Sequence, residues 1–316
     1  MTADRGDAGR RLDLVLRRHL SGVDHATRTR VQQWIERGQV SVNGVTVRRV
    51  ATRAALGDVL TVVLPAQAPR VIMTAEALDL AILYEDDHML ALDKPAGIVV
   101  HPGYRNTAHT VMNALLWRAR AWPAGQRPSI VGRLDKLTSG IVVVAKTAAI
   151  HAALQRAMAS NQTEKSYLAV VYGRVNIPRG RIELGLARDR QDRRKVVASA
   201  ADGSPSLTEF ERLARVAGLS LLECRLVTGR MHQIRVHLAA RGWPIVGDPT
   251  YGEPRWSTIA DAALGATLRV FSRQALHAWR VSLRHPVTGA PLSIQAPVPR
   301  DFQDLLTAAG LSLPAF

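Results

Sequence analysis

The sequence predicts an α+β fold, in which a small domain of two helices and a hairpin precedes a larger domain built on a mixed, mostly antiparallel sheet. Three observations lead to this prediction. Apolar residues recur at helical spacing near the N-terminus, short β-rich runs dominate the remainder, and the helical segments do not alternate regularly with those runs. The chain has 316 residues, which is long enough for more than one domain.

The N-terminal domain is expected to span residues 10–65. Its two helical candidates carry apolar residues at intervals typical of one helix face: Leu12, Val15, Leu16, Leu20, Val31, Trp34 and Ile35. In the segment 40–47, Asn43-Gly44 stands between alternating apolar residues, which is a strong signal for a two-residue hairpin turn. A further strand at 59–64 completes the domain.

The larger domain is expected to span residues 72–300, after a proline-containing linker at 66–71 and before a C-terminal tail at 301–316. Strand candidates lie at 81–84, 89–92, 97–100, 141–144 and 167–172. Helical candidates lie at 109–119, 148–159 and 231–241. Because strands dominate and the helices are irregularly placed, we expect a mostly antiparallel sheet.

The charge of the chain indicates a polyanionic partner. The formal net charge is +16, and a field of this sign attracts nucleic acid. A basic surface that contacts only solvent is the alternative. We expect no membrane segment, because no apolar run approaches the length needed to cross a bilayer. With no secretory signal at the start and a single cysteine, the sequence favours a protein of the cytoplasm.

Arginines are frequent in the expected N-terminal domain. Residues 1–65 hold 11 arginines against six acidic residues. Several lie on or beside the helical candidates, where they are placed to neutralise phosphates; the candidates are Arg17, Arg18, Arg28 and Arg30. For each of them a solvated basic face remains the alternative.

Two dense clusters of polar residues stand out in the larger domain. In the first, Asp135 lies between the cations Arg133 and Lys136, shortly before the apolar run 141–144. This pattern is typical of an ionised acid at the lip of a sheet, braced by the packing behind it. The second cluster, residues 228–237, reads Thr-Gly-Arg-Met-His-Gln-Ile-Arg-Val-His.

These clusters resemble motifs of the RluA/RluD-type pseudouridine synthases, which isomerise uridine within structured RNA. The matching motifs are Arg-Leu-Asp at 133–135, Lys-Ser-Tyr at 165–167 and Ile-Arg-Val at 234–236. Further family landmarks lie at 93–103, 242–252 and 273–278. The N-terminal domain resembles the alpha-L RNA-binding module first seen in a small-subunit ribosomal protein. The resemblance covers about residues 10–300, and the full set of motifs in this order is highly specific.

The resemblance implies a role for individual residues and a reaction without a cofactor. Asp135 would attack the ribose as a nucleophile or remove its 2′ hydrogen to give a glycal, two roles that the sequence does not separate. Arg235 would pair with Asp135, while Tyr167 would stack on the uracil and accept the last proton. Arg133 would enter the RNA and fill the gap left by the extruded base, and Arg230 would add an RNA contact.

Two departures from the family pattern lie in the loop around Asp135. Gly132 stands where His is usual, and Leu137 stands where an acidic residue is usual. They motivate an alternative function, a non-catalytic RNA-binding or ribosome-assembly factor on the same fold. A charged, turn-rich block at 186–205 is either an arm that grips RNA or a solvated hairpin.

No metal site is expected. His232 and His237 are five positions apart, and no cysteine or carboxylate cluster accompanies them. There is also no glycine-rich phosphate loop of the kind that nucleotide-dependent enzymes use. The resemblance implies that the function is the isomerisation of uridine to pseudouridine, and we expect the protein to act as a monomer. Large-subunit ribosomal RNA is the expected substrate, with transfer RNA as the alternative.

Overall fold

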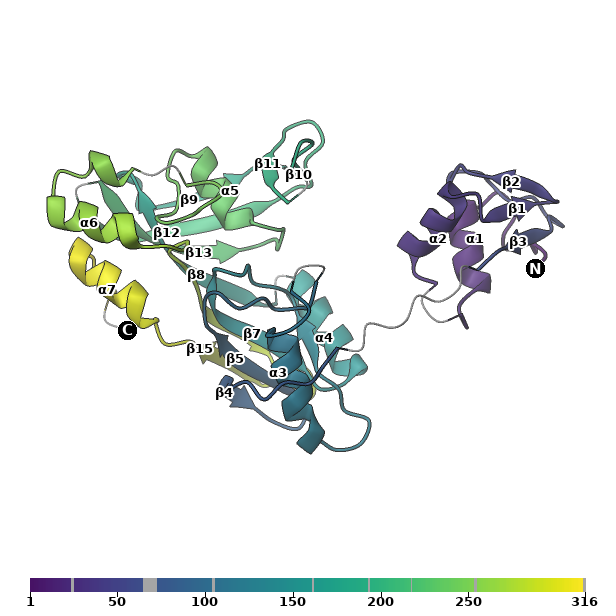
Figure 1. Ribbon diagram of the computed structural model, residues 1–316, viewed down its shortest axis with the longest axis horizontal. Coiled ribbons are helices and arrows are strands. Elements are labelled where there is room, and N and C mark those ends of the chain that lie inside the picture. The colour runs from purple at the N-terminus through teal and green to yellow at the C-terminus, as the bar shows by residue number, and fades with distance from the viewer. Residues whose placement is uncertain are drawn as a thin grey trace. The chain divides into compact units, whose positions relative to one another are not determined.

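The computed structural model describes residues 1–23, 26–64, 73–103, 106–160, 162–192, 194–216, 218–252 and 255–314. The chain divides into two compact units, Met1–Ile72 and Met73–Phe316, which are drawn in Figure 1. Each unit has a hydrophobic core of its own. The expected linker at 66–71 lies outside the described residues.

The first unit packs two helices against a three-stranded antiparallel sheet. Its elements are α1 (Leu12–His19), α2 (Arg28–Glu36), β1 (Val40–Val42), β2 (Val45–Val47) and β3 (Leu60–Val62), with strand order β2-β1-β3. The apolar residues at helical spacing are all buried in one cluster, which confirms both predicted helices. Asn43 and Gly44 connect β1 to β2 with φ of 53° and 82°. Positive φ at both positions is what a tight hairpin of this kind requires, so the predicted hairpin is also confirmed.

The second unit is organised around a ten-stranded sheet. Its main path runs through β4 (Ala81–Glu85), β5 (Met89–Lys94), β7 (Ser139–Ala145), β14 (Leu276–Arg284), β8 (Glu164–Tyr172), β13 (Leu219–Leu226), β12 (Leu207–Val216) and β9 (Arg179–Glu183). Two more strands lie off this path: β6 (Ser129–Val131) pairs with β7, and β15 (Pro291–Gln295) pairs with β14. Among these strands only β7 and β14 run parallel. The expected mixed, mostly antiparallel sheet is confirmed.

Helices cover both faces of this sheet. They are α3 (Val111–Arg118), α4 (Ala148–Ala159), α5 (Gln233–Ala240), α6 (Ala262–Val270) and α7 (Arg300–Ala309), with short 3-10 turns at Ala119–Ala121 and Trp256–Thr258. On β5, Leu90 packs with Leu115 of α3, whereas its neighbour Met89 packs with Leu154 of α4 on the opposite face. Burial on both faces explains why the predicted strand at 141–144 is apolar throughout. None of the described helices is long and apolar enough to cross a membrane.

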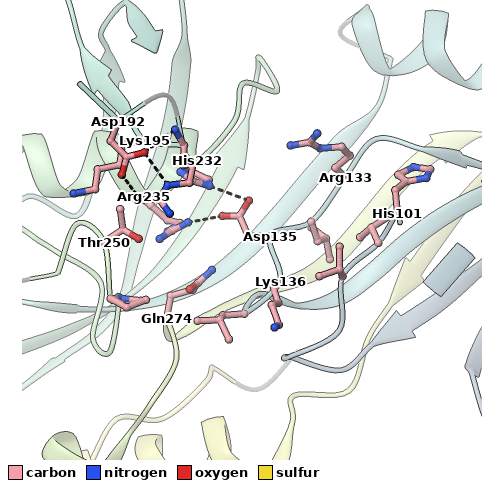
Figure 2. Close-up of a pocket in the computed structure, with 16 residues that line it drawn as sticks. His101, Arg133, Asp135, Lys136, Asp192, Lys195, His232, Arg235, Thr250 and Gln274 are labelled. Carbon is pink, nitrogen blue, oxygen red and sulfur yellow. Dashed lines mark hydrogen bonds and ion pairs between the residues drawn. The ribbon is translucent and has the colours of Figure 1, made fainter. Parts of the chain in front are cut away.

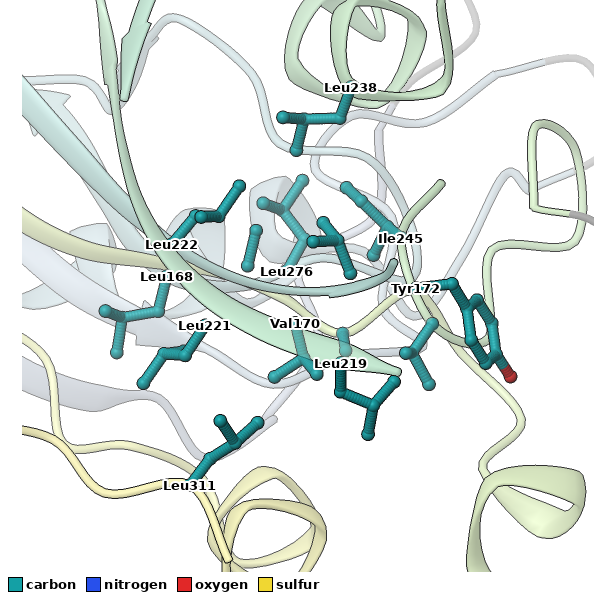
Figure 3. Packing of buried hydrophobic residues seen from close by; sticks show 14 of the residues in the cluster. Leu168, Val170, Tyr172, Leu219, Leu221, Leu222, Leu238, Ile245, Leu276 and Leu311 are labelled. Carbon is teal, nitrogen blue, oxygen red and sulfur yellow. The ribbon is translucent and has the colours of Figure 1, made fainter. Parts of the chain in front are cut away.

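The other half of the sheet carries the largest core, part of which is shown in Figure 3. Leu238 of α5 lies over one face of β8 and β13, and Leu311, just after α7, lies over the opposite face. Phe302 and Leu305 of α7 are fully buried in the same core. The segment 301–316, which we expected to be a tail, therefore contains a packed helix within its described part.

The segment 97–100, predicted as a strand, is a loop. Its first residue, Gly97, has φ of 95°, a turn conformation that follows the end of β5 at Lys94. The carbonyls of Val99 and Val100 accept hydrogen bonds from the amides of Val111 and Met112 at 3.0 and 3.1 Å. These amides lie in the first turn of α3, where a helix has no acceptors of its own. The loop thus caps a helix instead of joining the sheet.

The charged block at 186–205, called the arm below, forms an antiparallel hairpin of β10 (Leu186–Arg188) and β11 (Val196–Ala198). Leu186 and Val196 are buried against Val236 of α5, and the hairpin lies beside α5 in Figure 1. Arg194 and Lys195 near the turn are exposed. The base of the arm is therefore held by packing, while its basic end faces solvent.

Candidate active site

Asp135 lies in the loop between β6 and β7, and neighbouring segments hold this loop in place. The amide of Thr138 donates to the carbonyl of Asp135 at 3.1 Å, which closes a turn. The Thr138 hydroxyl accepts a hydrogen bond from Gln274 at 2.9 Å, and the carbonyl of Lys136 accepts one from the amide of Gly97 at 2.8 Å. The Asp135 side chain is 24% exposed, so a fixed loop presents its carboxylate at the surface.

A buried lysine supports the same loop. Lys94, the last residue of β5, is fully buried, and its Nζ donates to the carbonyls of Pro95, Ile98 and Lys136 at 2.8, 3.0 and 3.2 Å. Burial lowers the pKa of Lys94 to about 8, although the charge of Asp135 opposes this shift. Since an ammonium has three N–H donors, all three bonds can form at once and tie the 95–98 loop to the Asp135 loop.

The strand that follows the loop passes very close to its neighbour. Gly140 of β7 has φ of 110°, and a Cβ at this position would lie 2.2 Å from the backbone oxygen of Ala278 on β14. Beside it, the Ser139 hydroxyl and Nδ1 of His277 are 3.0 Å apart. Gly140 is therefore required by packing, and together with the Ser139–His277 contact it fixes where the loop meets the sheet.

Arg235 of α5 connects Asp135 to a second carboxylate. Its Nη1 donates to Oδ2 of Asp135 at 2.8 Å, while Nε and Nη2 donate to the two oxygens of Asp248 at 2.7 and 2.8 Å. The side chain of Asp248 is fully buried, and it accepts two further hydrogen bonds from the amides of Thr250 and Tyr251. Burial acts to lower the pKa of Arg235, but the bonds and charges of Asp248 and Asp135 outweigh it and raise this pKa. The guanidinium is therefore always charged.

An open cleft of about 600 Å³ surrounds this pair. Figure 2 shows the Asp135 carboxylate directed at Arg235 within it. The cleft is lined on one side by the Asp135 loop, including Arg133, and on another by the arm, including Arg194 and Lys195. The groove is open and carries cations on both sides of a carboxylate. The cations can attract a polyanion, and the carboxylate can then face one of its sugars.

A second, smaller cavity of about 60 Å³ also reaches Asp135. Its lining includes five of the predicted site residues: Asp135, Tyr167, Arg235, Arg133 and Arg230. Tyr167, on β8, is half-buried and packs against the large core. Burial and the charge of Asp135 raise the pKa of the Tyr167 hydroxyl, so the phenol is neutral. The structure thus brings the residues of three separate motifs around one cavity.

Comparisons with known proteins identify the family. Residues 88–240 match the RNA pseudouridylate synthase family model, and residues 10–60 match the S4 domain model. The chain is 42% identical to the ribosomal large subunit pseudouridine synthase D of Xanthomonas campestris pv. campestris, over 95% of this chain and 89% of that protein. The chain belongs to the RNA pseudouridine synthases. It is also 38% identical to the uncharacterized RNA pseudouridine synthase YlyB of Bacillus subtilis, over 89% of this synthase and 88% of that protein.

Solved structures share the fold of this synthase. Human RNA pseudouridylate synthase domain containing 4 aligns with a TM-score of 0.61 and 22% identity, over 74% of this chain and 95% of that one. Human RNA pseudouridylate synthase domain containing 1 aligns with a TM-score of 0.57 and 25% identity, over 74% of this chain and 89% of that one. This synthase is an isomerase that converts uridine to pseudouridine in RNA, and its N-terminal unit carries an S4 RNA-binding domain. The alternative of a non-catalytic factor is set aside.

Four arginines of the S4 domain are predicted to bind RNA. Two of them contact acidic residues of the same domain, and the other two present their charge to solvent. Arg18 pairs with Asp7 at 2.8 Å, and the Nε of Arg28 lies 3.5 Å from Asp13. These two guanidinium groups already face acidic partners of the same domain. Arg17 and Arg30, the other two candidates, are exposed on α1 and α2 and present their charge to solvent.

The two departures from the family pattern have different structural consequences in this synthase. Gly132 has φ of 85°, and a Cβ at this position would meet no atom within 4 Å. The backbone conformation, rather than lack of space, is therefore what favours glycine there. Leu137 lines the large cleft, so an apolar side chain takes the place of the usual acidic one.

The residues that support the Asp135–Arg235 pair lie outside the predicted set of catalytic residues. Asp248 and Tyr251 lie in a segment that matched the family, and His232 was considered only as a metal ligand. In the synthase, Nε2 of His232 lies 3.6 Å from Oδ1 of Asp135. A usable signal was Asp248 itself, because an acid inside the mostly apolar run 243–249 needs a cationic partner when it is buried.

Proposed function

We propose that this synthase modifies uridine in the RNA of the large ribosomal subunit, with Asp135 acting on the ribose, Arg235 as its ion partner and Tyr167 at the base. The contact between Nη1 of Arg235 and Oδ2 of Asp135, 2.8 Å long and at a basic cleft, carries the proposal. A buried cation at this distance stabilises the negative charge that an acid needs when it acts on an anomeric centre.

The reaction breaks the bond between C1′ of the ribose and N1 of uracil, turns the base and joins C1′ to C5. Asp135 either bonds to C1′ as a nucleophile or removes the 2′ hydrogen to give a glycal. Both routes need a carboxylate that faces the sugar. After the new bond forms, C5 loses a proton and N1 gains one, so a group that moves protons is needed beside the base.

Tyr167 is our candidate for the group beside the uracil. Its ring lines the smaller cavity together with Asp135, which suits stacking on a base whose sugar faces the acid. Because its hydroxyl is neutral, it can take up the C5 proton only while it passes its own proton to a neighbouring acceptor. Tyr167 therefore acts in this scheme as a stacking platform and a proton relay.

Arg133 is our candidate for the residue that replaces the flipped base. It is exposed and lines both cavities, two positions before Asp135 in the chain. A stacked base hides its glycosidic bond, so the nucleotide must leave the helix before Asp135 can reach it. Unstacking costs a few kcal/mol, and a planar guanidinium that occupies the vacated space offsets part of this cost.

The choice of ribosomal RNA rests on the relatives, several of which are named ribosomal large subunit pseudouridine synthase D. The test uses RNA labelled with tritium at C5 of uracil, from cells that lack the gene. We expect the protein to release tritium from large-subunit ribosomal RNA and not from transfer RNA. Release from transfer RNA alone would show that the substrate is misassigned, and no release from any cellular RNA would contradict the proposed activity.

Matched variants test the residue roles. Asp135→Asn preserves the shape of the side chain but removes its charge, and we expect no detectable release with unchanged RNA affinity. Glu211→Gln on β12 is the same chemical change in an exposed ion pair with Arg179, away from the cleft. It should retain wild-type activity, so loss of activity in both variants would point to a general effect on folding.

The S4 domain is proposed to bind RNA through its exposed arginines. Replacing Arg17 and Arg30 together by Glu should weaken RNA binding without changing turnover at saturating RNA, since phosphate contacts position the protein. We also propose that the synthase acts as a monomer in the cytoplasm. Light scattering during size-exclusion chromatography measures the mass directly.

A further inference from the structure

We propose that His232 is a positioning residue, which holds the Asp135 carboxylate through its Nε2–H, and that Tyr251 sets the tautomer of His232 needed for this contact. The inference rests on the proposed role of Asp135. It adds a second donor to the carboxylate, on the oxygen that Arg235 does not use.

The two donors approach different oxygens of the same carboxylate. Nε2 of His232 lies 3.6 Å from Oδ1 of Asp135, and Nη1 of Arg235 lies 2.8 Å from Oδ2. Figure 2 shows both contacts as dashed lines. The histidine contact is longer than a formed hydrogen bond, but such contacts at catalytic groups often tighten only when substrate is bound. Donors on both oxygens would stop the carboxylate from rotating away from the sugar.

Tyr251 determines which nitrogen of His232 carries the proton. The Tyr251 hydroxyl lies 2.8 Å from Nδ1 of His232 and accepts a hydrogen bond from the amide of Val196 at 2.9 Å. The phenol has one proton of its own, and Nδ1 is the acceptor in reach. With Nδ1 accepting, a neutral imidazole carries its proton on Nε2, which faces Asp135. An ionised carboxylate only accepts, so both ends of the ring favour this tautomer.

The surroundings keep the imidazole neutral. Burial lowers the pKa of His232, and the guanidinium groups of Arg235 and Arg133 act in the same direction, against the charges of Asp135 and Asp248. Its side chain is 17% exposed, and it lines both the large cleft and the smaller cavity. His232 therefore contributes a directional N–H beside the substrate site rather than a second full charge.

The backbone at His232 is unusual. Its φ of 56° places it in the left-handed region, at the start of α5, the helix that carries Arg235. Residues other than glycine adopt this conformation rarely, and asparagine is among those that tolerate it best. Such strained residues cluster at functional sites, where the surrounding contacts hold them. One short stretch of chain thereby delivers both donors to Asp135.

A matched pair of variants separates the two nitrogens. His232→Gln places an amide N–H near the position of Nε2, whereas His232→Asn keeps a polar group near Nδ1, suits the left-handed backbone and cannot reach Asp135. We expect His232→Asn to lower kcat about tenfold with unchanged RNA affinity, the pattern for a contact that matters in the transition state. His232→Gln should recover most of this loss. Tyr251→Phe should fall between the wild type and His232→Asn.

Three kinetic results would overturn the proposal. They are wild-type kcat in His232→Asn, equal impairment of the Gln and Asn variants, and weaker RNA binding with unchanged kcat. The last would make His232 an RNA contact instead.

A spectroscopic test needs no substrate. In protein labelled with 15N-histidine, the resonances that disappear in His232→Asn belong to His232, and we expect a neutral ring with its proton on Nε2 at pH 7.5. A proton on Nδ1, or a cationic ring, would contradict the proposal. Because this measurement involves no RNA, it distinguishes failure of the inference from failure of the proposed function, which the wild-type tritium assay reports separately.

Discussion

Replacing Asp248 by asparagine tests whether Arg235 is held from behind. The buried Asp248 side chain accepts bonds from Nε and Nη2 of Arg235 at 2.7 and 2.8 Å. In the variant, one oxygen can still accept from Nη2 and from the amides of Thr250 and Tyr251. The new amide nitrogen, however, faces Nε, which places a donor against a donor. One charge-assisted bond and one buried counter-charge are lost.

The cost of this change follows from burial. Breaking a buried ion pair from one side costs about 3–5 kcal/mol, and since Arg235 retains Asp135, we expect a loss of about 3 kcal/mol in the free energy of unfolding. The guanidinium can then turn away from Asp135, and because a misplacement of about 1 Å at a catalytic group costs up to about 100-fold, kcat should fall about 10–100-fold.

Urea unfolding and tritium release measure the two effects. Glu211→Gln is again the control, because its partner Arg179 is 76% exposed. An exposed pair of this kind contributes about 0–1 kcal/mol, so this variant should remain close to wild type in both assays. If the free energy of unfolding of Asp248→Asn lies within about 1 kcal/mol of the wild-type value and its kcat is unchanged, the buried carboxylate does not hold Arg235 and our reasoning is refuted.

Three further predictions concern the site. Tyr167→Phe keeps the ring but removes the proton relay. The single-turnover rate constant should fall about 100-fold, while RNA affinity, measured by filter binding, stays unchanged. Gly140→Ala places a Cβ against the backbone of β14 and should cost more than about 3 kcal/mol in urea unfolding, whereas Gly132→Ala, with open space around its Cβ, should cost only about 1–2 kcal/mol. Lys94 has its pKa lowered to about 8 from 10.5, so the unfolded chain binds more protons between these values. The stability of the wild type relative to Lys94→Met should therefore rise from pH 8 toward pH 10.5, and a flat difference would show that Lys94 is not desolvated.

The sequence predicts those parts of the molecule that depend on local pattern. The hairpin at Asn43-Gly44 follows from turn chemistry, and the strand at 141–144 follows from its apolar run. The segment 97–100 has an equally apolar composition, but its carbonyls cap α3, a contact that no local pattern encodes. The C-terminal helix carries apolar residues at helical spacing, Phe302, Leu305 and Leu306, a local pattern that the prediction of a tail at 301–316 does not use.

The candidate site divides in the same way. Asp135 and Arg235 were paired in advance by resemblance to a family, although 100 residues separate them. Their supports were not anticipated, because Asp248, His232 and Lys94 act through geometry that only the folded chain supplies. A buried acid or lysine in an apolar segment indicates that a partner exists, but it does not say which residue the partner is.

The order of strands also has a consequence for how the enzyme is made. Strand β14 lies between β7 and β8, yet it is the last but one of the strands to be synthesised. Chains emerge from the ribosome from the N-terminus, so the S4 domain can fold while the sheet is still in two separate pieces. Until Leu276–Arg284 inserts, no strand joins β7, which follows the loop of Asp135, to β8, which carries Tyr167. A nascent chain can therefore bind RNA before it can modify it.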